Sequence, residues 1–102
     1  MNDVIEIIRG RTLLIEGEWP DGEEFTNDTS LSAVLQRKDV PDIVVTVSKT
    51  GPRLFRIYAS AAATTGWQPG VYDAILNRTD AGFFSNGDDF VHGPEKFNVK
   101  VI

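Results

Sequence analysis

The sequence contains no cysteine, a single histidine and no long apolar run. Without cysteine the chain has no disulfide framework, no thiolate nucleophile and no cysteine-ligated zinc or iron–sulfur site. No apolar stretch approaches the ~20 residues that a membrane-spanning helix needs. Lysine and arginine number 10 against 15 aspartates and glutamates, and this negative balance argues against binding nucleic acid through its phosphates. We therefore expect neither a membrane nor a nucleic acid as partner.

The first residues, Met1-Asn2-Asp3-Val4-Ile5-Glu6, lack the basic flank and apolar core of a signal peptide. We therefore expect the protein to stay in the cytosol where it is made. A length of 102 residues allows one modest hydrophobic core, whereas two domains would each fall near the size at which cores fail. The sequence predicts a single domain over residues 1–102.

What the chain does contain is a series of short runs in which apolar and polar residues alternate, the pattern of β-strands. Turn residues separate these runs, as in Trp19-Pro20-Asp21-Gly22. One run, Leu31–Arg37, also suits a helix by composition, but its neighbours favour a strand. A single helical turn is expected over Ser60–Gly66. The predicted strands are Val4–Arg9, Thr12–Glu18, Leu31–Arg37, Ile43–Lys49, Arg53–Ala59, Val71–Arg78 and Lys96–Ile102, with a further hairpin around Asn86-Gly87 in Phe83–His92.

Seven or eight short strands in about 100 residues predict an all-β, immunoglobulin-like antiparallel β-sandwich, with a small β-barrel as the alternative. Gly70-Val71-Tyr72 resembles the tyrosine corner of such domains, in which a tyrosine hydroxyl bonds to nearby backbone. Trp67 is expected to fill the core beside Tyr72. The alternation predicts a core of Ile5, Leu13, Ile15, Leu35, Val45, Val47, Phe55, Ile57, Tyr72, Leu76, Phe97 and Val99.

No catalytic site is evident in the sequence. A Ser–His–Asp arrangement would have to use His92, with Ser60 or Ser85 as the nucleophile and Asp88 or Asp89 as the orienting acid. No serine lies in a nucleophile motif, and His92 stands beside Gly93-Pro94. We expect a solvated loop histidine and no enzymatic activity.

Metal and cofactor sites are likewise not expected. Asp88-Asp89 and the acidic stretch of Asp21, Glu23, Glu24 and Asp28 have oxygen ligands but lack the alternating spacing of a calcium loop. No glycine-rich nucleotide-binding motif occurs. The basic clusters Arg9-Gly10-Arg11 and Arg37-Lys38 are expected to face water at strand ends or to pair with nearby carboxylates, and not to bind phosphate.

Several apolar residues would remain exposed on an isolated sandwich, and they predict a protein interface. On the first run Val4 and Ile8 point away from the core, and Leu14 does so on the next run. Phe83 and Phe84, adjacent on a predicted strand, should face opposite sides, so one of them should be exposed. The candidate interface is therefore Val4, Ile8, Leu14, Phe83 and Phe84, and it predicts a homo-oligomer or a tight protein complex.

Two segments also resemble a known family. The opening Ile7-Ile8-Arg9-Gly10-Arg11-Thr12-Leu13-Leu14-Ile15, followed by Trp19-Pro20-Asp21-Gly22, is similar to the start of the immunoglobulin-like domains of tailed-phage virion proteins, notably the N-terminal domain of siphophage upper baseplate proteins. Thr64-Thr65-Gly66-Trp67-Gln68-Pro69-Gly70-Val71-Tyr72 resembles a later segment of the same domains.

The resemblance implies a non-enzymatic structural component of a phage or prophage particle, in the tail, baseplate or fibre attachment. Its partners would be other virion proteins or further copies of itself, and it would occupy the bacterial host cytoplasm during assembly and then the virion. The alternative is a stand-alone bacterial module that binds a peptide or carbohydrate through its loops.

Overall fold

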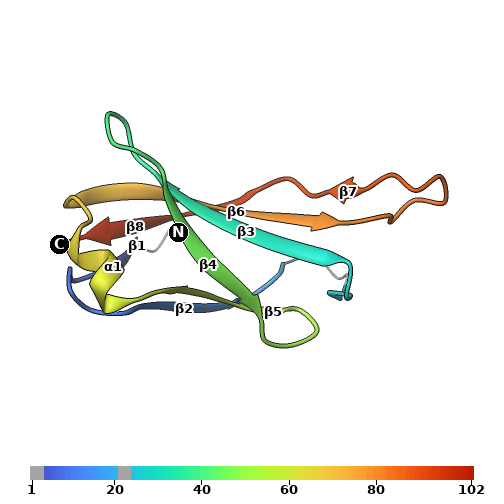
Figure 1. The fold of residues 1–102 in the computed structure, drawn as a ribbon, viewed down its shortest axis with the longest axis horizontal. Helices are drawn as coiled ribbons and strands as arrows, with labels where there is room; N and C mark the ends of the chain where they lie inside the picture. The colour runs from blue at the N-terminus through green and yellow to red at the C-terminus, as the bar shows by residue number, and fades with distance from the viewer. Residues whose placement is uncertain (1–3, 21–23) are drawn as a thin grey trace.

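The computed structural model describes residues 4–20 and 24–102 (Figure 1). The predicted turn at Asp21-Gly22 and the acidic residues Asp21 and Glu23 lie outside these residues. The elements are β1 (Val4–Ile7), β2 (Leu13–Glu18), β3 (Thr29–Gln36), β4 (Ile43–Lys49), β5 (Leu54–Ala59), α1 (Ala61–Thr65), β6 (Gly70–Asp80), β7 (Phe90–Val91) and β8 (Glu95–Val101).

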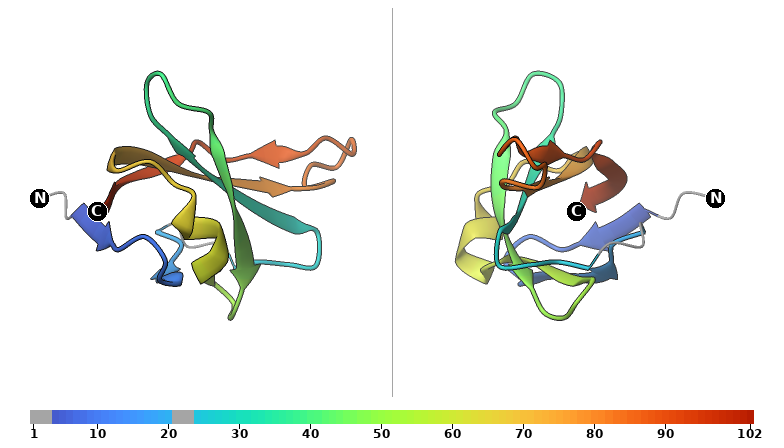
Figure 2. Two further views of the ribbon diagram at one scale, coloured as in Figure 1. Left: turned by 60° about the vertical axis from the view of Figure 1, so that its left-hand side comes forward. Right: turned by 90° about the vertical axis from the view of Figure 1, so that its right-hand side faces the viewer.

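The strands form one sheet that curls until it is nearly closed (Figures 1 and 2). Their order is β1-β8-β6-β3-β4-β5-β2, with β7 paired to β6. The predicted all-β fold is confirmed, and the near closure gives the barrel-like form that was the stated alternative to two separate sheets.

Strand β4 joins the two halves of the sheet. Its first part, Ile43–Val45, pairs with β3, and its second part, Thr46–Lys49, pairs with β5. In a sandwich the strands of one sheet form no hydrogen bonds with those of the other. Here β4 pairs with a strand of each half, so the two halves form one continuous sheet. The predicted strands Ile43–Lys49 and Arg53–Ala59 pair as the hairpin of β4 and β5.

Both edges of the sheet come from the start of the chain. β1 pairs only with β8, and β2 pairs only with β5, among the described residues. The prediction of a wholly antiparallel sheet is wrong at one place, because β1 runs parallel to β8. The last strand, β8, is not an edge strand, because it lies between β1 and β6.

The core contains the inward side chains that the alternation predicts. Eight of the twelve predicted core residues are buried, and the other four, Ile5, Ile15, Val47 and Phe97, are partly buried and pack against the core. Trp67 is buried as expected. Alternation identifies these positions because each strand presents every second side chain to one face of the sheet.

A short helix fixes the turn between β1 and β2. The fully buried Thr64 of α1 accepts a hydrogen bond from the Gly10 amide at 3.1 Å and donates one to the Arg11 carbonyl at 2.7 Å. Gly10 has a φ of 85°, a conformation that glycine adopts without strain. Arg9 and Arg11 are therefore presented on an anchored turn. No helix in the described residues has the length and apolar character needed to cross a membrane.

The tyrosine corner has the geometry expected from the Gly70-Val71-Tyr72 sequence. The Tyr72 hydroxyl donates to the Gln68 carbonyl at 2.7 Å, and the Tyr72 ring is buried. Gly70 begins β6 with a φ of 143°, which a residue with a Cβ rarely adopts. The hydrogen bond ties the segment through Trp67 to the start of the longest strand.

A Tyr72→Phe variant is expected to lower the free energy of unfolding by about 0.5–1.5 kcal/mol, because the part-buried hydrogen bond from Tyr72 to the Gln68 carbonyl is lost. Urea denaturation followed by tryptophan fluorescence measures the change. Tyr58→Phe is the matched control, because Tyr58 lies on β5 with 43% of its surface exposed. Equal stability of the two variants would contradict a stabilising role for the corner.

Candidate functional site

The five predicted interface residues are all exposed, and they fall into separate regions of the molecule. Val4, Ile8 and Leu14 lie on or beside the two edge strands, and Phe83 and Phe84 lie in the loop between β6 and β7. Their exposed fractions range from 46% to 53%. Side chains of this size at such exposure leave apolar surface in water, which favours burial against a partner.

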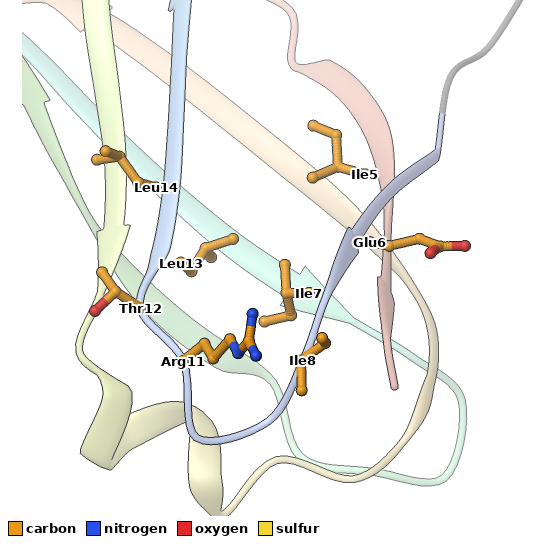
Figure 3. Close-up of a pocket in the computed structure, with 8 residues that line it drawn as sticks. All are labelled: Ile5, Glu6, Ile7, Ile8, Arg11, Thr12, Leu13 and Leu14. Carbon is orange, nitrogen blue, oxygen red and sulfur yellow. The ribbon is translucent and has the colours of Figure 1, made fainter.

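A groove separates the two edge strands (Figure 3). Ile7 and Leu13 point toward one another across it, and Glu6 points away into solvent. Ile8 and Arg11 lie at the end where the chain turns from β1 to β2. Among the residues that the structure describes, β1 and β2 are each paired on one side only. The groove is therefore bordered by strand edges, which are sites of protein association when they are not protected.

The second region is a cluster of three phenylalanine rings on the hairpin formed by β6 and β7, which projects beyond the other strands (Figure 1). The Phe83 and Phe84 ring centroids are 5.2 Å apart, and both rings contact Phe90, at 5.1 and 5.8 Å. The prediction that Phe83 and Phe84 face opposite sides is wrong. Neither residue lies in a strand, so strand alternation does not separate them.

The aromatic cluster continues into the interior of the protein. Phe90 stacks on His92 with ring centroids 4.2 Å apart and an interplanar angle of 7°. The edge of His92 then meets Trp19, at 5.9 Å. Trp19 is almost completely buried. The exposed Phe83 and Phe84 rings are thus connected to the core through Phe90 and His92.

Beneath this cluster lies a buried network centred on Asp80. His92 Nε2 contacts Asp80 Oδ2 at 2.7 Å, and an Arg78 terminal nitrogen lies 3.2 Å from the same oxygen. The Thr29 hydroxyl donates to Asp80 Oδ1. Arg78 also donates to the Glu24 carbonyl, and its guanidinium lies 4.9 Å from the Phe25 ring centroid.

The environment of Asp80 favours its ionised form. Burial raises the pKa of Asp80, but the hydrogen bonds from its three partners and the positive charge of Arg78 lower it by more, so the pKa lies below its ordinary value. The buried carboxylate therefore remains charged and compensates the buried Arg78.

The expectation of a solvated His92 is wrong, because the structure places it in this network at 8% exposure. Sequence reasoning also missed Arg78, Asp80 and Trp19 as interior residues. A signal for two of them was present: the inward series Tyr72, Ala74 and Leu76 on β6 continues at the same spacing to residues 78 and 80.

The network does not match the catalytic arrangement considered from the sequence. His92 pairs with Asp80 and not with Asp88 or Asp89, and Ser60 Oγ accepts the Ala63 amide at the start of α1. Asp88 and Asp89 shape the hairpin loop: Asp88 Oδ2 accepts from Asn86, and Asp89 Oδ1 accepts the Gly82 amide. Within residues 4–20 and 24–102, no three histidines or acidic residues come together as a metal site.

Comparison with known proteins gives a likeness in fold alone. No family model matches the chain, and no curated protein matches it. A solved structure of a putative glycoside hydrolase from Bacteroides vulgatus is similar over 96% of this chain, with a TM-score of 0.52 and 11% sequence identity. This chain spans only 16% of the length of that protein, so a fold of this kind occurs there as part of a larger chain.

Proposed function

We propose that this chain is a non-enzymatic structural module that acts by docking to other proteins. The observation that carries the proposal is the Phe83–Phe84–Phe90 cluster, in which two rings are about half exposed at the end of a projecting hairpin. Aromatic side chains are enriched at the centres of protein interfaces, and rigid aromatic anchors lose little conformational entropy on binding. The two exposed rings pack against Phe90, which stacks on the buried His92, and these contacts restrict their movement.

We further propose that the partners belong to a phage or prophage particle, in the tail, baseplate or fibre attachment. The support is the resemblance of Ile7–Ile15 and Thr64–Tyr72 to segments of tailed-phage virion domains, together with the β-fold. On this proposal the chain assembles in the cytoplasm of the bacterial host and ends in the virion, without contacting nucleic acid or membrane.

Purified particles test this role directly. Particles released from cells that encode the chain should contain it in a fixed ratio to the other virion proteins, as measured by quantitative mass spectrometry. Particles that lack the chain would refute the virion assignment, and genes for tail or tape-measure proteins beside its own gene would favour it.

A Phe84→Asp variant is expected to reduce incorporation into particles by at least about tenfold, because a charge at the centre of an aromatic contact must be desolvated on docking. The matched control is Val44→Asp on β4, where the valine side chain is 82% exposed and lies outside the predicted interface. Normal incorporation of Phe84→Asp would show that the docking surface lies elsewhere.

A second candidate function is binding of a peptide or carbohydrate by a stand-alone module. One observation favours it: Phe83 borders a polar groove with Glu24, Thr26 and Asp28, and sugar-binding and peptide-binding sites combine an apolar wall with a few polar groups. The similar fold within the larger Bacteroides vulgatus protein agrees with a module of this kind. Glycan-array binding that Phe83→Ala abolishes would favour this candidate over the virion role.

A further inference from the structure

The two exposed regions lie at opposite ends of the molecule. The structure measures 46 × 29 × 27 Å, and Figure 1 shows the β6–β7 hairpin at one end of the long axis and the turn between β1 and β2 at the other. Each copy of the chain therefore has one exposed region at each end of its long axis. Whether the two regions fit one another depends on their charge and shape.

The hairpin end is aromatic and acidic. We define the tip patch as Phe83, Phe84, Asp88 and Asp89. Residues 81–92 contain no lysine or arginine. Hydrogen bonds from Asn86 and Gly82 hold the two carboxylates in position, and neither forms an ion pair with a described residue. The tip patch therefore presents fixed negative charge beside exposed rings.

The opposite end is basic and aliphatic. We define the turn patch as Ile8, Arg9, Arg11 and Leu14. Ile8 and Leu14 are 48% and 53% exposed, and both arginines are exposed. Thr64 anchors the backbone of this turn, and neither arginine forms an ion pair with the residues that the structure describes. Its charge is opposite to that of the tip patch.

The groove beside the turn patch is large enough for an aromatic ring. It is an open groove of about 230 Å³ between β1 and β2, and this volume exceeds the about 150 Å³ of a closed cavity that holds a benzene molecule. Most of the side chains that line it are aliphatic, and the polar ones are Glu6, Arg11 and Thr12. The Glu6 side chain points away from the groove (Figure 3). Guanidinium groups such as that of Arg11, which also lines the groove, pack favourably against aromatic faces.

We propose that the chain associates head to tail with a second copy of itself, the tip patch of one copy docking on the turn patch of the next. A phenylalanine of the tip enters the groove between β1 and β2, and Asp88 and Asp89 pair with Arg9 and Arg11. This inference rests on the proposed docking function and names its partner. A symmetric contact of two tips is disfavoured, because it would bring carboxylates of like charge together.

A head-to-tail contact leaves one free tip patch and one free turn patch on every open assembly. Such heterologous contacts produce open chains, or closed rings where the rotation between copies permits closure. Successive copies are thus added along the long axis of the protein. Because charge pairs at the rim of the contact are screened by salt, association should weaken as the ionic strength rises.

The first test measures the mass of the full chain by light scattering after size exclusion, at tens of micromolar protein. The wild type should exceed the monomer mass at low salt. A turn variant, Arg9→Glu with Arg11→Glu, and a tip variant, Phe84→Asp, should each raise the dissociation constant at least about 30-fold. Lys38→Glu and Val44→Asp are the controls, since both residues are exposed outside the two patches, and they should associate as the wild type does.

Mixing the two variants separates head-to-tail docking from every symmetric arrangement. Each variant alone is expected to be monomeric, but the turn variant keeps an intact tip and the tip variant keeps an intact turn. An equimolar mixture should therefore form a one-to-one dimer that cannot grow further, whereas a chain carrying both sets of substitutions should not pair with either. Thermal melts of each variant establish that it is folded.

Three outcomes would overturn the proposal: a monomeric wild type, a dimer unaffected by either variant, or a mixture of variants that stays monomeric. Each outcome leaves the docking function separately testable, because the chain can still occur in purified particles through contacts with a different protein. Conversely, head-to-tail association by a chain that is absent from particles would refute the virion role and support the self-docking contact.

Discussion

An Asp80→Asn variant is expected to lose about 3–5 kcal/mol of the free energy of unfolding at neutral pH, because it removes the negative charge of a buried carboxylate that contacts Arg78, His92 and Thr29. The side chains of Arg78 and Asp80 are only 1% and 9% exposed, so water compensates little of the loss. For a domain of ordinary stability, about 5–15 kcal/mol, the change threatens folding. Urea denaturation followed by circular dichroism measures it.

Asp73→Asn is the matched control, because Asp73 lies on the same strand with its side chain exposed, and its substitution should change stability by about 0.5 kcal/mol or less. Similar losses in the two variants would contradict a stabilising role for the buried network. An Asp80→Asn chain too unstable to purify would still be distinguished from the control by its yield of soluble protein.

The stabilisation by Asp80 is also expected to depend on pH. Its pKa in the folded protein lies below the ordinary value of 3.8, so the unfolded chain takes up this proton more readily than the folded one. The contribution is fully present above the unfolded pKa and is lost as pH falls through the folded pKa. The difference between wild type and Asp80→Asn should therefore shrink in acid. A difference that stays constant from neutral to strongly acid pH would contradict this assignment.

Much of the fold could be predicted from the sequence because strand alternation is a local property. Every second residue of a strand faces the same side, so the inward positions of β2, β5 and β6 can be recognised from their side chains without knowledge of the strands they pair with. The corner at Tyr72 was predictable for the same reason, since its hydrogen bond to Gln68 spans only four residues.

Pairing between distant strands could not be predicted in this way. The parallel contact of β1 with β8 joins the two ends of the chain, and neither run contains a signal for its partner. The change of partner along β4 likewise depends on how far the whole sheet curls. Near closure of the sheet is therefore a property of the assembled strands and cannot be recognised in any one of them.

The buried network is hard to predict from the sequence, because arginine, aspartate and histidine side chains usually face water. Residues 78 and 80 continue the inward series of β6, yet an arginine and an aspartate were not expected in a core. They are buried together because each neutralises the charge of the other. His92 lies opposite Arg78, and its amide donates to the Arg78 carbonyl at 3.0 Å. This position depends on the register of the β6–β7 hairpin. A two-residue turn at Asn86-Gly87 would have given a different register.

A Phe55→Ala variant is expected to lower the free energy of unfolding by about 3–5 kcal/mol, the range for removal of a buried aromatic side chain. Phe55 is 8% exposed and pairs across the sheet with Gly17. Its ring covers this glycine so closely that a Cβ built on Gly17 would lie 2.7 Å from Phe55 Cζ. Because Gly17 has no side chain to fill the space, the loss should fall near the upper end of the range.

The close approach of Phe55 to Gly17 also predicts how two substitutions combine. Gly17→Ala alone should destabilise the protein, because its methyl group displaces the Phe55 ring. In the Phe55→Ala background the same methyl group partly fills the cavity, so Gly17→Ala should cost less there or stabilise the protein, with a coupling of about 0.5–3 kcal/mol. Urea denaturation of the two single variants and the double variant measures this coupling, and Phe84→Ala at the exposed tip serves as the aromatic control. Additive effects of the two substitutions on the free energy of unfolding would show that the packing of the Phe55 ring does not depend on Gly17.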